Sequence, residues 1–133
     1  MKRHEIRENA FVLVFEKIFN DDDLTQIVEI AKECDDLQVN EEVIRIVTGV
    51  QQHVQELDAV ISEHLTKWSI SRLSKVVLAI LRLAVYEILF EDAIEPPIAI
   101  NEAVELAKTY ASQEDAAFIN GVLGGFVRKL EEK

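Results

Sequence analysis

The segment from Val76 to Phe90 reads VVLAILRLAVYEILF, and its only charged residues are Arg82 and Glu87. A helix that is apolar on all sides has to be buried in other protein. The run is shorter than the ~20 apolar residues that a membrane-spanning helix needs. Because an isolated charge in such a helix is costly, each of the two is expected to have a partner. We therefore predict a central buried helix in an all-α fold.

Composition indicates one folded domain over residues 1–133. Of these residues 49% are hydrophobic, which excludes a disordered chain. Only four glycines and two prolines occur, which favours long helices over strands joined by many turns. The single cysteine, Cys34, has no partner for an internal disulfide, and the N-terminus lacks the apolar core of a signal peptide. We expect a cytoplasmic protein.

The net charge of −11 is unevenly distributed. Residues 20–42 carry nine acidic side chains against one lysine, whereas no acidic residue occurs between Leu65 and Tyr86. That interval and the N-terminus hold basic residues, which are Lys2, Arg3, His4, Arg7, Lys67, Arg72, Lys75 and Arg82. An acidic region suits a basic protein partner, and the basic regions suit a nucleic acid.

Apolar periodicity and capping residues predict seven helices with short links and no strand. The expected helices span residues 5–19, 24–34, 41–55, 55–66 and 76–92. A sixth helix has Pro96 and Pro97 in its first turn and reaches Tyr110, and a last helix follows Ser112. The junction near Gln55 is either a kink in one long helix or a break between two. Ser69 or Ser71 is expected to cap the central helix, and Trp68 is interpreted as a core residue before it.

The first helix carries two neighbouring apolar stripes. Phe11, Phe15 and Phe19 form the second of them. Two packing neighbours explain such a wide face most simply. The alternative is that Phe15 or Phe19 contacts a partner protein.

The sequence contains no pattern typical of a catalytic, metal or cofactor site. Glu-x-x-His pairs, a second cysteine, nucleophile motifs and phosphate-binding glycine loops are all absent from it. Arg82 and Glu87 lie five positions apart and face each other poorly along one helix. We interpret them as part of a buried polar network that fixes helix register, with Asn101 or Glu102 as the expected partner of Arg82.

Three blocks of sequence carry a resemblance to a known family. They are LRLAVYE at 81–87, INEAVELAK at 100–108 and FINGVL at 118–123. In this order they resemble the NusB family of bacterial transcription antitermination factors. The resemblance implies an all-helical fold in two packed halves and an RNA-binding regulatory protein without enzymatic activity. A similar fold in some RNA methyltransferases precedes a catalytic domain, which we do not expect here.

The resemblance also implies partners and contact residues. NusB proteins pair with NusE, a protein of the small ribosomal subunit, and bind single-stranded boxA RNA of ribosomal RNA operons. With RNA polymerase and other elongation factors they support read-through of terminators. The family's basic N-terminal segment matches Lys2, Arg3, His4 and Arg7, and further RNA contacts fall on Glu114, Phe118 and Asn120.

Two alternatives stay open at this point. Phe118 is equally well explained as a core residue, and Asn120 as an amide between packed helices. The helical module as a whole is also compatible with protein interaction or homodimerisation, with RNA binding a minor role.

Overall fold

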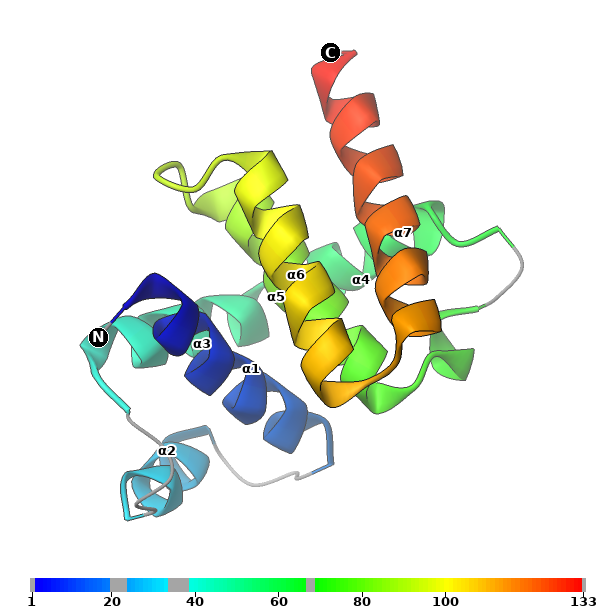
Figure 1. Cartoon of the computed structure of the whole chain (residues 1–133). Coiled ribbons are helices and arrows are strands. Elements are labelled where there is room, and N and C mark those ends of the chain that lie inside the picture. The colour runs from blue at the N-terminus through cyan, green and yellow to red at the C-terminus, as the bar shows by residue number, and fades with distance from the viewer. Residues whose placement is uncertain (1, 20–23, 34–38, 67–68, 133) are drawn as a thin grey trace. The chain divides into compact units, whose positions relative to one another are not determined.

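A computed structural model describes residues 2–19, 24–33, 39–66 and 69–132 (Figure 1). Within these ranges the chain forms seven α-helices, one short 3-10 helix and no strand, which confirms the all-α prediction. The helices are α1 (Arg3–Phe19), α2 (Leu24–Lys32), α3 (Glu41–Gln52), α4 (Val54–Glu63), η1 (Ile70–Arg72), α5 (Lys75–Phe90), α6 (Pro96–Tyr110) and α7 (Gln113–Glu131).

The chain divides into two compact units, Met1–Gln52 and His53–Lys133. The boundary falls at His53, where α3 ends and α4 begins. The backbone of His53 has φ −110° and ψ 15°, outside the helical range, so the junction is a break between two helices. It lies slightly before the expected position near Gln55.

The first unit is built on α1, which packs against α2 and α3. Its core is formed by Ala10, Phe11, Leu13, Val14, Ile27, Val28, Ala31, Val43, Ile46, Val47 and Val50. Asn40 caps α3, because its Oδ1 accepts a hydrogen bond of 2.9 Å from the amide of Val43. The expected caps at 20–23 and the residue Cys34 lie outside the described residues.

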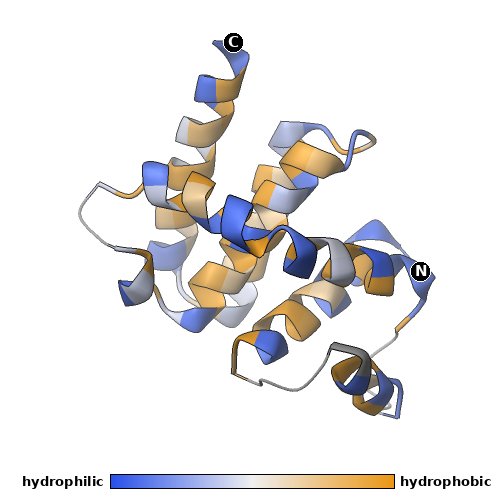
Figure 2. Ribbon diagram, turned by 180° about the vertical axis from the view of Figure 1, so that it is seen from behind, coloured by the Kyte–Doolittle hydropathy of each residue, from blue (hydrophilic) through white to orange (hydrophobic). Residues whose placement is uncertain are grey.

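In the second unit α5 packs against α4, α6 and α7. Ten residues of α5 are buried, and they are the five in Val77–Leu81 and the five in Leu83–Glu87. Helix α7 is amphipathic, and Figure 2 shows hydrophobic and hydrophilic bands alternating along this C-terminal helix. Its buried residues are Ala116, Ile119, Val122, Leu123, Phe126 and Val127. The all-round apolar helix predicted from the sequence is therefore the buried element of this unit.

One helix cap differs from the sequence prediction, and two helix starts agree with it. Ser74 caps α5, since its Oγ accepts from the amide of Val77 at 3.2 Å. Ser69 and Ser71 were the wrong candidates: they flank the start of η1, and their hydroxyls lie 2.9 Å apart. Helix α6 begins at Pro96 and holds both prolines in its first turn as predicted, because proline fits the first turn of a helix. Ser112 caps α7 as predicted, with a 3.0 Å bond from the amide of Asp115. Trp68 lies outside the described residues.

Arg82 has a different partner from the one expected. Its Nε and Nη2 donate to the two carboxylate oxygens of Asp58 on α4, each at 2.8 Å. The expected partners lie on α6, where Asn101 is exposed and Glu102 is half-buried. The correction follows from helix geometry: position 82 of α5 faces α4. Glu87 is buried, with 3% of its surface exposed.

Candidate RNA-binding site

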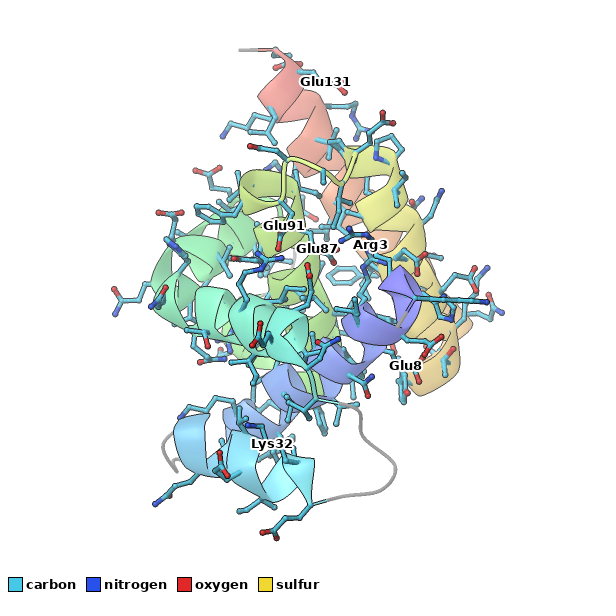
Figure 3. All side chains as sticks on the ribbon, turned by 90° about the vertical axis from the view of Figure 1, so that its left-hand side faces the viewer. Arg3, Glu8, Lys32, Glu87, Glu91 and Glu131 are labelled. Atoms are coloured by element: carbon cyan, nitrogen blue, oxygen red, sulfur yellow. The ribbon has the colours of Figure 1, made fainter. Side chains whose placement is uncertain are left out.

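The predicted basic segment lies at the start of α1. Lys2, Arg3 and His4 are exposed there, and the carbonyl of Lys2 accepts 3.0 Å bonds from the amides of Glu5 and Ile6. Figure 3 shows Arg3 in this first turn. An exposed cation can approach a phosphate without losing a packing contact. The first three members of the segment therefore have the accessibility that RNA contact needs.

Arg7 is separated from this group by burial. Only 3% of its surface is exposed, and Arg7 has an intramolecular partner. A buried, partnered cation is a structural element of its helix. In the free protein its side chain is out of reach of a phosphate, which sequence spacing did not reveal.

Glu114 and Phe118 are brought together on α7. They lie one helical turn apart and line a pocket of about 360 Å³. The rest of the lining comes from the region between η1 and α5 and from the first turn of α7, as Arg72, Leu73, Ser74, Val77 and Asp115. Half-buried Phe118 contributes an aromatic wall. The pocket is formed entirely within the second unit.

Arg72 lines this pocket, although motif reasoning did not single it out. It is exposed, and its side chain makes no hydrogen bond or ion pair with the residues that the structure describes. The same is true of the carboxylate of Glu114. Arg72 lies in the acid-free interval between Leu65 and Tyr86, so the charge pattern contained the information that would have found it.

Asn120 lies elsewhere on α7. It is exposed but does not line the pocket. Successive helical residues are rotated by about 100°, so a residue two positions from Phe118 faces a different direction. Next to it, Gly121 has open space where a side chain would begin. Asn120 is therefore a surface residue, and neither a core contact nor a helix-packing amide.

Phe15 and Phe19 form an aromatic pair near the end of α1. Their ring centroids are 4.9 Å apart and the rings meet edge to face. Phe15 also lies 6.2 Å from the buried Phe11. Exposure rises along this stripe, from 3% at Phe11 to 62% at Phe19. The outer end of the stripe offers an apolar surface to a partner.

Two further features of the chain bear on the kind of site. Among the described residues, no group of three histidine, cysteine or acidic side chains is arranged to hold a metal ion. In the same part of the chain, no helix is both long enough and apolar enough to cross a membrane.

Comparison with known proteins identifies the family. The NusB family model matches residues 4–128. Transcription antitermination protein NusB of Agathobacter rectalis is 45% identical, over 95% of this chain and 99% of its own length. The protein of the same name from Clostridium novyi is 42% identical, over 96% of this chain and 99% of its own length.

Solved structures agree with this result. T. maritima NusB has a TM-score of 0.84 at 34% identity, with 96% of this chain and 92% of that chain covered. A structure of the antitermination factors NusB and NusE in complex with dsRNA has a TM-score of 0.83 at 27% identity, with 96% of each chain covered. This chain is therefore a member of the NusB family of transcription antitermination proteins.

Proposed function

We propose that this chain forms a heterodimer with ribosomal protein NusE and binds boxA-type single-stranded RNA of ribosomal RNA operons. In the cytoplasm the complex acts with RNA polymerase and other elongation factors to support transcription through terminators. The observation that carries this proposal is the similarity, over 96% of both chains, to the NusB that was solved with NusE and RNA. Membership of the NusB family also confirms that the chain is not an enzyme.

The exposed residues Lys2, Arg3 and His4 are proposed as the phosphate-binding group. About three phosphate contacts on single-stranded RNA give a salt slope near −2, at about −0.7 per contact. This electrostatic attraction is weak, and the net charge of −11 reduces it further because the chain repels RNA at long range. Affinity for boxA RNA therefore depends on base contacts and on the partner protein.

Base contacts are proposed at the start of α7. Unpaired bases are recognised by stacking on aromatic rings and by hydrogen bonds to their edges. Phe118 and Glu114 both line the pocket, so an aromatic ring for stacking and a carboxylate that accepts hydrogen bonds occur in one site, which supports this assignment. Asn120, exposed on the neighbouring face of α7, offers an amide that both donates and accepts.

NusE is proposed to contact Phe15 and Phe19. Exposed aromatic side chains are typical anchors of protein interfaces. A basic ribosomal protein also offsets the acidic surface of this chain, so the heterodimer presents less negative charge to RNA than this chain alone. Because the family match at 4–128 spans both compact units, we propose that they act as one domain.

A second candidate is a protein-interaction or homodimerisation module in which RNA binding is minor. Two observations favour it: the net charge of −11 and the 62% exposure of Phe19. In this case a second copy of the chain covers the aromatic stripe. Sedimentation of the free protein, with Phe19→Ser as the comparison, separates a dimer from a monomer.

The proposal is tested by titrating a labelled boxA-type RNA with the protein at several salt concentrations, with and without NusE. The expected result is weak binding alone and tighter binding with NusE. Arg3→Ala should flatten the salt slope by about 0.7, the contribution of one contact. The matched control is Lys32→Ala, which removes an exposed cation on α2 (Figure 3) and should leave the slope unchanged. Equal slopes for the two variants would remove Arg3 from the RNA-binding group.

A further inference from the structure

The end of the second unit at which α5 turns into α6 exposes apolar side chains. Phe90, the last residue of α5, is 38% exposed, and Ile98 in the first turn of α6 is 46% exposed. The ring of Phe90 stacks on that of His53 at the start of α4, with centroids 4.3 Å apart and an interplanar angle of 24°. It also lies 5.2 Å from the buried ring of Tyr86. Phe90 is therefore held in place by its neighbours, so a partner that covers it loses little side-chain entropy on binding.

The same end is rich in acidic residues. No lysine, arginine or histidine occurs between Arg82 and Lys108, whereas this interval contains six acidic residues. Asp92 and Glu95 lie in the turn between the helices and are exposed. Their carboxylates make no hydrogen bond or ion pair with the residues that the structure describes. A cationic partner can bind them without displacing an existing contact.

The exposed side chains at this end are defined here as the α5–α6 surface. It consists of His53, Glu56, Phe90, Asp92, Glu95 and Ile98. Glu56 belongs to it because one of its carboxylate oxygens lies 3.9 Å from Nδ1 of His53. Two exposed apolar side chains and three exposed carboxylates thus occur together, a combination that a single surface leucine or phenylalanine does not provide.

Helix α5 separates this surface from the proposed RNA contacts. Its 16 residues span about 24 Å. The pocket lined by Arg72 and Phe118 lies at the first turn of α5, in the interval without acidic residues between Leu65 and Tyr86. The α5–α6 surface follows the last turn of the same helix. One end of α5 therefore suits phosphates, and the other repels them.

A basic protein segment is the occupant that fits both the charge and the rings. An arginine guanidinium pairs with a carboxylate and also packs on an aromatic ring. A second copy of this chain fits poorly, because each copy has a net charge of −11 and presents the same carboxylates. NusE is assigned above to Phe15 and Phe19 of the first unit, which leaves this end of the second unit to another protein.

We propose that the α5–α6 surface binds a basic segment of a protein other than NusE. An arginine or lysine of that segment lies against Asp92 and Glu95, and an apolar side chain covers Phe90 and Ile98. The surface then attaches the heterodimer to a further component of the transcription machinery while RNA is bound about one helix length away. The inference rests on the proposed function and adds a second protein partner to it.

The first test uses short random peptides displayed on phage as the probe. They are selected on the immobilised protein with excess NusE present, which keeps the NusE surface covered. The enriched peptides should combine arginine or lysine with leucine or an aromatic residue. One of them is synthesised with a fluorescent label, and its Kd is measured by anisotropy. Phe90→Ser should weaken its binding at least about tenfold, as expected of an interface anchor. Ile30→Ser is the control, because it removes a 62% exposed side chain on α2.

The second test concerns the charge. The double variant Asp92→Lys with Glu95→Lys should weaken binding of the same peptide at least about tenfold and abolish its salt dependence. The control is Glu131→Lys with Glu132→Lys, which changes the net charge by the same amount at the end of α7 (Figure 3). The control should bind the peptide nearly as well as the unmodified protein. Circular dichroism melting establishes that each variant is folded.

The outcomes separate this inference from the function it rests on. It is overturned if no basic peptide is enriched, if Phe90→Ser and Ile30→Ser bind the peptide equally well, or if the two double variants do. It is also overturned if Phe90→Ser weakens binding of NusE or converts a dimer of this chain into a monomer, because the surface then serves NusE or a second copy. If the unmodified protein with NusE does not prefer boxA-type over scrambled RNA, the proposed function itself fails, whatever the peptide result.

Discussion

Arg82 and Asp58 form a two-bond ion pair that joins α5 to α4. The guanidinium Nε donates to Oδ1 and Nη2 donates to Oδ2, each at 2.8 Å. The side chains are 16% and 29% exposed, so the pair is partly shielded from water. A planar guanidinium fits a carboxylate in this parallel arrangement, and a lysine ammonium does not.

We therefore expect Arg82→Lys to lower the free energy of unfolding by about 1 kcal/mol and Arg82→Ala by about 2 kcal/mol, the range for hydrogen bonds between charged groups. Urea denaturation measures both values. Lys108→Ala is the control, because its ion pair with Glu105 is solvent-exposed. Such surface pairs contribute about 0.5 kcal/mol or less. A similar loss for Arg82→Ala and Lys108→Ala would contradict the stabilising role of the shielded pair.

Ser74 and Ser112 are expected to be the energetically important caps of the second unit. Each Oγ satisfies an amide in the first turn of a helix, so replacement by alanine should cost about 1 kcal/mol. Ser71→Ala is the comparison, because its hydroxyl bonds to that of Ser69 at the surface. It should cost less than about 0.5 kcal/mol. Thermal melting followed by circular dichroism gives all three values. A larger loss of stability for Ser71→Ala than for Ser74→Ala would contradict the capping assignment.

Arg3 and Arg7 are predicted to have different roles despite their proximity in sequence. Arg3 is exposed and Arg7 is 3% exposed. Removing one partner of a buried charged group costs about 3–5 kcal/mol. Arg7→Ala should therefore reduce stability by an amount of this order, whereas Arg3→Ala should weaken RNA binding and leave stability within about 0.5 kcal/mol. Chemical denaturation and RNA titration of both variants are the measurements. Loss of RNA binding with full stability in Arg7→Ala would show that its burial is not maintained when RNA is present.

The helices were predictable because their residues repeat with the helical period. The run from Val76 to Phe90 indicated a buried helix, and α5 is that helix, with a start shifted by one residue. Ser112 was correctly identified as a cap because Glu114 and Asp115 follow it within the first helical turn, ahead of an apolar repeat. The cap of α5 was missed because three serines stand close together at 69, 71 and 74, and local sequence does not show that Ser69 precedes η1 and Ser71 lies within it.

Contacts between helices were not predictable in the same way. The partner of Arg82 depends on which helix faces position 82, and this is set by packing over a separation of 24 residues. The burial of Arg7 likewise has no local sequence pattern. Among the candidate RNA contacts, Glu114 and Phe118 share a helical face by spacing alone. Their association with Arg72 depends on the approach of η1 to α7, which only the three-dimensional fold provides.

Gly121 lies within helix α7, and no neighbouring group requires a glycine at this position. No atom lies within 4 Å of the position that a Cβ would take. Gly121→Ala should therefore raise the free energy of unfolding by about 0.5–1 kcal/mol, through reduced freedom of the unfolded chain. Gly125→Ala is the comparison, since its Cβ would be in ordinary van der Waals contact with the ring of His64 at 3.5 Å, and it should gain a similar amount. Denaturant midpoints measure both gains, and a stability loss in Gly121→Ala would contradict the open environment.

Our proposal is that this chain and NusE together recognise boxA-type RNA. It is tested most directly by the ratio of affinities for boxA-type and scrambled RNA of equal length, measured with and without saturating NusE at one fixed salt concentration. A fixed salt concentration is essential, because the phosphate contribution changes steeply with salt. We expect a ratio near one for the chain alone and a ratio of at least about 10 with NusE, equivalent to about 1.4 kcal/mol of specificity. A ratio that stays near one with NusE present would contradict it.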